Sequence, residues 1–344
     1  MLTLIALLLS TPADSQTPAP VKVVTSLTTY AAIAREIVGE RGRVTSIATG
    51  DENPHFVQPR PSFVPLLASA DVFVTTGLDL ELWVPALLDK AANPKVSEGG
   101  PGYVAAWTGI TLREVPTTLS RAQGDIHVYG NPHIWTDPLN AVQIARNILA
   151  GLKRVSPANA AYFTTRARDF EDRLYRALYG EELVRLLTGP TLADLDRQGK
   201  LWDFLTTQQY QGEPLLTQLG GWLAQGRTMR GEQVVCYHKE WDYFSRAFQV
   251  SCFDYIEPKP GIPPTPRHVR ELIEAMQAKN IRVLFSTNYY DHRQVREIAR
   301  RTHATAVIVP SNAEGAPGTA TYFDLVTLWI TELAKAFAAT RGAS

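Results

Sequence analysis

The 344-residue sequence has few cysteines, no excess of charge of one sign and no long apolar run. Its two Cys exclude a disulfide-rich scaffold, and neither belongs to a C-x-x-C zinc or redox motif. Because 34 Lys plus Arg balance 34 Asp plus Glu, the net charge indicates neither nucleic acid nor an acidic membrane as a partner. The apolar run of residues 2–9 is far too short to span a bilayer.

Motifs of several enzyme classes are also missing. The sequence has no H-E-x-x-H, no G-x-S-x-G and no Gly-rich phosphate loop. His238 and Glu240 match the H-x-E half of a zinc-deaminase signature, but the P-C-x-x-C segment that this signature also needs is absent. We therefore expect no enzymatic activity. The enzyme alternative that stays open is a zinc-dependent hydrolase with Glu240 or Asp291 as its base.

The chain does contain enough apolar material for packed domains. Hydrophobic residues make up 45% of the sequence and charged residues 20%, which is typical of globular proteins and excludes a disordered or collagen-like chain. At about 150 residues per domain, the length predicts two domains.

The N-terminus has features of a secretory signal. Residues 2–9 are apolar, and Ala13 and Ser15 stand in an A-x-A-like arrangement before Gln16. We expect residues 1–15 to be removed as a signal peptide, which leaves a soluble protein in the periplasm or an equivalent extracytoplasmic compartment. No Cys follows the apolar run, so a bacterial lipid anchor is not indicated.

The two cysteines, Cys236 and Cys252, have two interpretations. An exported protein enters an oxidising compartment, where the pair could form one disulfide. Each cysteine also lies in an apolar run typical of a strand, where a free Cys packs as a small hydrophobic residue. The sequence leaves both interpretations open.

Short apolar runs alternate with helical patterns in both halves of the chain. This alternation predicts parallel α/β sheets, and runs that are apolar throughout indicate strands covered on both faces. The expected strands are residues 21–25, 43–48, 71–75, 233–237, 250–256, 282–286 and 306–309. The expected helices are residues 30–39, 61–68, 241–247, 266–279, 293–302 and 322–339.

Between the halves, residues 140–187 carry helical patterning with dense charge. We therefore expect an α/β fold of two lobes. Residues 16–156 form an N-terminal lobe, residues 157–187 one long linking helix, and residues 188–344 a C-terminal lobe of similar topology. Residues 188–230 are Gly-rich and irregular in pattern, so we expect them to be an insertion packed on the second lobe.

Three of the seven histidines stand where an expected strand ends. His55 and His133 each lie in an Asn-Pro-His frame, and His238 directly follows the strand of residues 233–237. In open α/β sheets, ligands bind at the carboxyl ends of the strands, and imidazole is a common zinc ligand. We therefore predict that these three residues bind a metal between the lobes. Because imidazole must be neutral to bind, we expect the affinity to fall below about pH 6.5.

The other four histidines do not share this placement. His268 and His303 fall within or at the end of expected helices, which indicates surface positions. His127 lies in the polar loop shortly before His133 and could contact a metal transiently. His292 flanks another loop and has no assigned role.

Three sequence blocks have a recognisable order. The first, residues 54–83, contains a Pro-His, a Pro-Ser, an Ala-Asp, a Gly and a Glu-x-Trp. The second, residues 132–138, reads Pro-His-x-Trp-x-Asp-Pro, and the third, residues 238–244, begins with His and ends with Tyr-Phe. Together they resemble the periplasmic metal-binding proteins of zinc and manganese ABC importers, the ZnuA/TroA family. The resemblance covers nearly all of the mature chain apart from residues 188–230.

The resemblance implies two α/β lobes joined by a rigid backbone helix, with the metal held between them by His55, His133 and His238. It also implies a high-affinity zinc-binding protein, acting as a monomer, that delivers Zn²⁺ to the membrane permease of an ATP-driven importer. Zn²⁺ is then cargo. A manganese-binding protein of the same importer class is the alternative.

Two departures from the family pattern bear on the metal. The family often has an Asp as fourth ligand in a Gly-Asp-x-Tyr-Tyr stretch, where this chain has residues 319–323 with Ala320 at the Asp position. The family's long His/Asp-rich loop before the second ligand is reduced here to residues 124–130. Three nitrogen donors without a matched carboxylate favour Zn²⁺ over Mn²⁺, which prefers oxygen-rich sites. We expect water, Asp291 or Glu240 at the fourth position.

Overall fold

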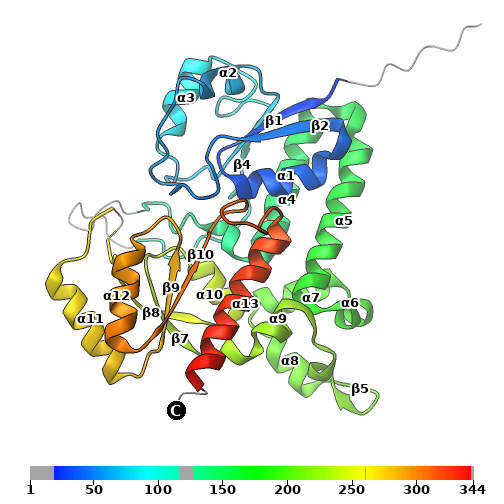
Figure 1. The fold of residues 1–344 in the computed structure, drawn as a ribbon. Coiled ribbons are helices and arrows are strands. Elements are labelled where there is room, and N and C mark those ends of the chain that lie inside the picture. The colour runs from blue at the N-terminus through cyan, green and yellow to red at the C-terminus, as the bar shows by residue number, and fades with distance from the viewer. Residues whose placement is uncertain (1–18, 117–126, 260, 342–344) are drawn as a thin grey trace, which may run out of the picture.

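The computed structural model describes residues 19–116, 127–259 and 261–341. The expected signal peptide, residues 1–15, lies outside these ranges. Two four-stranded sheets form the centres of two lobes, and long helices run along one side of the molecule (Figure 1). None of the helices in the described ranges combines the length and hydropathy of a membrane span.

The N-terminal sheet is parallel throughout and has the strand order β2-β1-β3-β4. Its strands are β1 (Val21–Thr25), β2 (Gly42–Ser46), β3 (Val72–Thr75) and β4 (Tyr103–Ala105). Its helices are α1 (Thr28–Val38), α2 (Phe63–Ala68), α3 (Val84–Ala91) and α4 (Pro138–Val155). Helix α1 packs on β1 and β2, and α4 packs on β3 and β4. The sequence pattern did not predict β4 or α3.

The C-terminal sheet is also parallel, with the order β10-β9-β7-β8. Its strands are β7 (Gln233–Cys236), β8 (Ser251–Tyr255), β9 (Val283–Thr287) and β10 (Thr305–Val309). Its helices are α10 (Asp242–Phe248), α11 (Pro266–Ala278), α12 (His292–Thr302) and α13 (Tyr322–Arg341). Numbered within its own lobe, each sheet has the order 2-1-3-4. The predicted α/β fold class and the similar topology of the lobes are therefore confirmed.

The linking segment differs from the single helix expected over residues 157–187. A 3-10 turn at Pro157–Asn159 precedes α5 (Ala160–Tyr179), and Gly180 separates α5 from α6 (Glu181–Leu187). Gly180 has φ 89°, and a Cβ there would lie 2.5 Å from the Cα of Gly220. A side chain would therefore be strained and would clash, so the glycine ends the long helix earlier than its apolar periodicity suggests.

Residues 188–230 are more regular than expected. They form α7 (Gly189–Arg197), α8 (Leu201–Thr207), a short hairpin of β5 (Gln209–Tyr210) and β6 (Glu213–Pro214), and α9 (Gly221–Gln225). Helices α7 and α9 pack on α5, and α9 also contacts α13. The segment thus lies against the linking helix as well as the second lobe, at the end of the molecule away from the N-terminal sheet (Figure 1).

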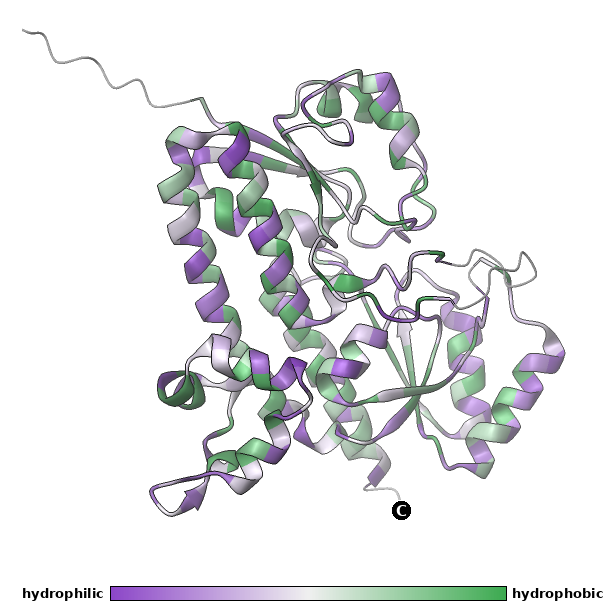
Figure 2. Cartoon of the chain, turned by 180° about the vertical axis from the view of Figure 1, so that it is seen from behind, coloured by the Kyte–Doolittle hydropathy of each residue, from purple (hydrophilic) through white to green (hydrophobic). Residues whose placement is uncertain are grey.

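One apolar core extends across both lobes. It runs from the N-terminal sheet through α4, α5 and α13 to one face of the C-terminal sheet, and it includes the fully buried Trp135, Trp241 and Trp329. A separate cluster, with Val235 and Leu284, lies beneath α11 and α12 on the other face. Figure 2 shows hydrophobic residues along the strands and hydrophilic residues on the outer helix faces. The lobes are therefore joined by shared packing as well as by the linking helix.

Polar contacts also join the lobes where the loop after β10 meets the N-terminal lobe. Thr28 Oγ1 donates to the carbonyl oxygen of Ala313 at 2.5 Å, and Thr29 Oγ1 donates to Asn312 Oδ1 at 2.8 Å. The backbone of Gly50 is so close that a Cβ there would lie 2.3 Å from the Ala313 oxygen. This contact permits no side chain, which fixes the approach of the two loops.

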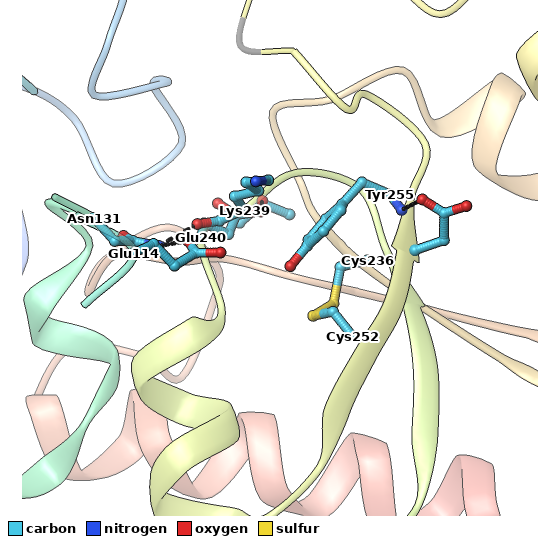
Figure 3. Close-up of a disulfide and its surroundings, with 9 residues drawn as sticks. Glu114, Asn131, Cys236, Lys239, Glu240, Cys252 and Tyr255 are labelled. Carbon is cyan, nitrogen blue, oxygen red and sulfur yellow. Dashed lines mark hydrogen bonds between the residues drawn. A yellow bond between two sulfur atoms is a disulfide. The ribbon is translucent and has the colours of Figure 1, made fainter. Parts of the chain in front are cut away.

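The two cysteines form a disulfide. Cys236 on β7 and Cys252 on β8 are bonded, with 5.5 Å between their Cα atoms, and they link neighbouring strands of the C-terminal sheet (Figure 3). Of the two interpretations of the sequence, the disulfide is therefore the one that the structure adopts.

Candidate metal centre

Four histidines from distant parts of the chain converge between the lobes. His55, His127, His133 and His238 each offer a ring nitrogen, and these four atoms all lie within 4.8 Å of one another. His55 stands in the loop after β2, His133 caps a 3-10 turn, and His238 follows β7. The structure thus brings the three predicted ligands together and adds His127.

The spacing of the rings suits a single metal ion. His55 Nε2 lies 3.1 Å from His133 Nε2, and the ring centroid of His238 is 5.7 Å from that of His55 and 5.8 Å from that of His133. Two nitrogens bound to one tetrahedral zinc at about 2.0–2.1 Å are about 3.3 Å apart. The observed distance between the Nε2 atoms is close to that value.

The two Asn-Pro-His frames fold in the same way. Asn53 Oδ1 accepts a hydrogen bond from the backbone N–H of His55 at 3.0 Å, and Asn131 Oδ1 accepts one from the N–H of His133 at 3.0 Å. Each Asn side chain therefore closes a turn onto the residue two positions later, while the intervening Pro fixes φ. The repeated frame gives each imidazole a rigid backbone.

Asn131 also orients the ring of His133 and reaches the other lobe. The Oδ1 atom of Asn131 lies 2.9 Å from His133 Nδ1. Its Nδ2 atom donates to Glu114 Oε2 at 2.8 Å and to the carbonyl oxygen of Lys239 at 2.6 Å (Figure 3). Because the amide oxygen accepts from Nδ1–H, the Nε2 lone pair of His133 is left for a metal. Because Lys239 directly follows His238, the same amide also links the N-terminal lobe to the segment that carries His238.

His127 is held by a carboxylate from the loop after β3. Its Nδ1 lies 3.1 Å from Asp79 Oδ1, and Asp79 Oδ2 accepts from the N–H of Val128 at 2.8 Å. The His127 side chain is 13% exposed, and its ring stacks on that of His55 with 5.0 Å between centroids. The sequence indicates only a transient metal contact for His127 and gives no signal for Asp79, because neither residue belongs to an Asn-Pro-His frame or is a His at a strand end.

His238 is less constrained than the other three. Neither of its buried ring nitrogens has a hydrogen-bond partner among the described residues, and Glu257 Oε1 is 4.0 Å from Nδ1. The Nε2 of His127 is likewise buried without a partner. Buried polar atoms are usually paired, since desolvation without a partner is costly. A metal ion bound by these nitrogens would offset that cost.

Burial keeps the imidazoles of His55, His133 and His238 neutral. It lowers the pKa of His55 and His133 well below the ordinary value of 6.5, and the charges of neighbouring histidines lower these pKa values further. Burial, followed by the neighbouring charge of His127, lowers the pKa of His238 to about 3. At neutral pH these rings therefore present lone pairs, the form that binds a metal.

Neither carboxylate expected at the fourth position joins the cluster. Glu240 is fully buried, where it accepts hydrogen bonds from Thr287 Oγ1 and, at 2.6 Å, from the hydroxyl of Tyr289. Burial raises its pKa to about 7. Asp291 instead caps α12, with its Oδ1 accepting from the N–H of Arg293 at 2.9 Å. That expectation is therefore corrected, because both side chains are engaged in local structure.

The remaining positions named from the sequence lie elsewhere. Ala320 is exposed directly before α13, and His303 is exposed as expected. His268 is half-buried rather than on the surface, because its Nε2 contacts the carbonyl oxygen of Tyr255 at 2.8 Å. His292 Nε2 contacts the carbonyl oxygen of Asn288 at 2.7 Å. None of these residues is part of the metal-ligating group found in the described ranges.

Several known metal-uptake proteins are similar to this chain over most of its length. The sequence model of the ZnuA family, described as zinc-uptake complex component A, periplasmic, matches residues 23–178 and 207–336. The chain is 24% identical over 326 residues to the iron-binding protein YfeA of Yersinia pestis, covering 94% of this chain and 88% of YfeA. It is 20% identical over 328 residues to the manganese ABC transporter substrate-binding lipoprotein PsaA of Streptococcus mitis, covering 94% and 92% of the two chains.

The fold is also shared with solved structures. A crystal structure of a ZnuA deletion mutant with zinc bound has a TM-score of 0.66 and 19% sequence identity to this chain. The likeness covers 92% of this chain and 98% of that one. It supports the assignment of two α/β lobes.

Proposed function

We propose that this chain, which belongs to the ZnuA family, binds Zn²⁺ outside the cytoplasm and delivers it to the membrane permease of an ABC-type metal importer. In this proposal the lobes of residues 16–156 and 188–344 act as one monomeric binding unit, and Zn²⁺ is its cargo. The names of its relatives share metal binding, and PsaA is named as part of an ABC transporter.

The observation that carries the proposal is the convergence of buried, neutral imidazoles from both lobes. His55 and His133 come from the N-terminal lobe and His238 from the C-terminal lobe, and the nitrogens of all three lie within 4.8 Å of one another. We propose these three residues as metal ligands. Neutral imidazole binds a metal directly, without first losing a proton.

The donor set favours zinc. The relatives are named for iron and manganese as well as zinc, so we argue the metal from the ligands. No carboxylate of the described residues belongs to the cluster, which consists of histidines alone. Imidazole suits Zn²⁺, whereas Mn²⁺ prefers carboxylate, carbonyl and water oxygens. Zinc is therefore the expected cargo and manganese the alternative.

A hydrolase would need a general base beside the metal. The two candidates, Glu240 and Asp291, are engaged with Tyr289 and with the start of α12 respectively. A base must reach the water that it activates, directly or through one further water. The geometry therefore favours metal transport over metal-dependent hydrolysis.

Metal competition tests the proposal. The chain from residue 16 onward would be stripped of metal and titrated with Zn²⁺, Mn²⁺ and Fe²⁺ in the presence of a chromophoric chelator. We expect one zinc ion per chain and a zinc affinity well above that for manganese. Stoichiometric preference for Mn²⁺ or Fe²⁺ would overturn the choice of metal, and absence of tight binding of all three would overturn the function.

A growth experiment tests the delivery step. Deletion of the gene in its own host should impair growth under zinc chelation, and added zinc should restore growth. The matched control is the same strain carrying a variant in which His55, His133 and His238 are all replaced by Ala. Rescue by this variant as complete as by the unaltered gene would contradict the role of these ligands.

A further inference from the structure

His127 has the geometry of a metal ligand although its part of the sequence gives no such signal. Its Nε2 is buried without a hydrogen-bond partner, while its other ring nitrogen contacts a carboxylate. Its ligating nitrogen lies within 4.8 Å of those of His55, His133 and His238. One ring nitrogen of His127 thus belongs to the cluster, and Nε2 is the nitrogen that no hydrogen bond of the described residues occupies.

Asp79 fixes this orientation from a separate loop. One of its oxygens contacts His127 Nδ1 at 3.1 Å, and the other accepts from the backbone N–H of Val128 at 2.8 Å. The carboxylate therefore holds both the ring and the backbone beside it. With the proton of the imidazole on Nδ1, the Nε2 lone pair is the one available to a metal, as in carboxylate–histidine–zinc arrangements.

We infer that His127 is the fourth metal ligand, oriented by Asp79, and that it completes a site of four imidazoles. This inference rests on the proposed metal-binding function and deepens it. It replaces the water or carboxylate that the sequence suggests at the fourth position. Three of the four ligands then belong to the N-terminal lobe.

A site of four imidazole nitrogens selects a class of metal. It supplies no oxygen donor to Mn²⁺, Mg²⁺ or Ca²⁺, while it suits Zn²⁺ and the late divalent ions Co²⁺, Ni²⁺ and Cu²⁺. The positive charge of the ion is balanced from outside the ligand set, by Asp79 on His127 and by Glu257, whose Oε1 is 4.0 Å from His238 Nδ1. His127 is therefore a residue that determines specificity.

The test counts imidazoles around the metal. X-ray absorption spectra of the zinc-loaded full chain should show four histidine nitrogens, and those of His127→Ala should show three nitrogens and a longer or oxygen-type fourth contact. Co²⁺ in the unaltered protein should give the intense visible bands of a tetrahedral site, with changed bands in His127→Ala. His303→Ala, at an exposed position, is the matched control and should leave both spectra unchanged.

Affinity measurements separate the ligand from its positioning residue. Asp79→Asn should keep four nitrogens but weaken zinc binding by about tenfold. His127→Asp should introduce an oxygen donor and lower the ratio of zinc affinity to manganese affinity. Tight zinc binding with three imidazoles in the unaltered protein, or unchanged spectra in His127→Ala, overturns this inference but leaves the proposed function standing. Failure of the unaltered protein to bind zinc overturns both.

Discussion

The two sheets have the same strand order, yet the lobes contribute unequally to the cluster of histidines between them. The N-terminal lobe supplies His55, His127 and His133, and the C-terminal lobe supplies only His238. A shared topology thus provides two equivalent sets of loops, and the loops of one lobe carry most of the site. Function in this fold is set by the loops at the strand ends and not by the sheet itself.

The difference extends to the groups around the ligands. Asn131 contacts one ring nitrogen of His133, and Asp79 one of His127. Within the part of the chain that the structure describes, neither ring nitrogen of His238 has a hydrogen-bond partner. Two of the three rings from the N-terminal lobe, those of His127 and His133, are therefore held by side chains outside the cluster. In the proposed site, the ligand from the C-terminal lobe would gain its partner when the metal binds.

Acid should have the largest effect on this arrangement. Burial lowers the pKa of His55, His133 and His238 in the folded protein, while each has a pKa near 6.5 in the unfolded chain. Below about pH 6.5 the unfolded chain therefore binds more protons than the folded protein does. As a result, the free energy of unfolding of the metal-free protein should decrease as the pH is lowered. The slope should approach about 4 kcal/mol per pH unit for three protons.

Denaturant titrations at pH 7.5, 6.0 and 5.0 measure that slope. Replacement of His55 and His133 by Asn should flatten the profile more than replacement of His238 alone, since two of the three protons belong to the N-terminal lobe. Equal stability of the metal-free protein at all three pH values would contradict the prediction.

Loss of the disulfide should destabilise the C-terminal sheet. Cys236 and Cys252 are 16 residues apart, and a loop of that length corresponds to about 3 kcal/mol in the chain-entropy account. We expect the double variant Cys236→Ala, Cys252→Ala to lose about that free energy of unfolding. Hydrogen exchange should show the loss first in β7 and β8, with β1 and β3 of the N-terminal lobe as the internal reference. Unchanged protection of β7 and β8 would argue against it.

Replacement of single ligands should show directly how unequally the two lobes contribute to zinc affinity. Structural zinc sites bind with about 10–16 kcal/mol, so one ligand of four corresponds to about 3 kcal/mol, or roughly 100-fold in affinity. We expect His133→Ala to weaken zinc binding by at least this factor and His238→Ala by less, because the held N-terminal ligands remain. Competition titrations measure both, and His268→Ala should cost little. A larger loss in His238→Ala would reverse the comparison.

The two Asn-Pro-His frames offer the finest comparison. Asn53 and Asn131 close the same turn, but only Asn131 also contacts a ring nitrogen and the carbonyl oxygen of Lys239. Asn131→Ala should therefore weaken zinc binding by about tenfold, and Asn53→Ala by a smaller factor. Calorimetric titration of the two variants decides this, and equal effects would mean that only the turn matters.

Much of the fold could be predicted because buried parallel strands are apolar throughout. All seven expected strands are present, with ends that differ by at most two residues. The strand β4 has only Tyr103–Ala105, too short for a pattern, and the break at Gly180 depends on close packing against Gly220. Packing between distant segments of this kind leaves no local periodicity.

The candidate site, like the fold, was predictable where local sequence patterns define it and not where contacts between distant segments do. His55, His133 and His238 could be found because their loops follow the sheet topology. His127 depends on Asp79, which is 48 residues away, and no spacing rule connects them. The sequence predicts that zinc affinity declines below about pH 6.5. Because burial lowers the pKa of His55, His133 and His238, we expect the decline to begin at a lower pH.

The apolar core that continues from one lobe into the other has a consequence for the rate of cargo exchange. Separating the lobes would expose core surface to water at about 2.5 kcal/mol per 100 Å², and a few hundred Å² would equal the whole stability of a typical domain. We therefore expect wide opening of the two lobes to be too rare to set the dissociation rate. We therefore expect the ion to leave by local displacement of a loop. Among the described residues neither ring nitrogen of His238 has a hydrogen-bond partner, so His238 is the proposed ligand with the fewest hydrogen bonds to break.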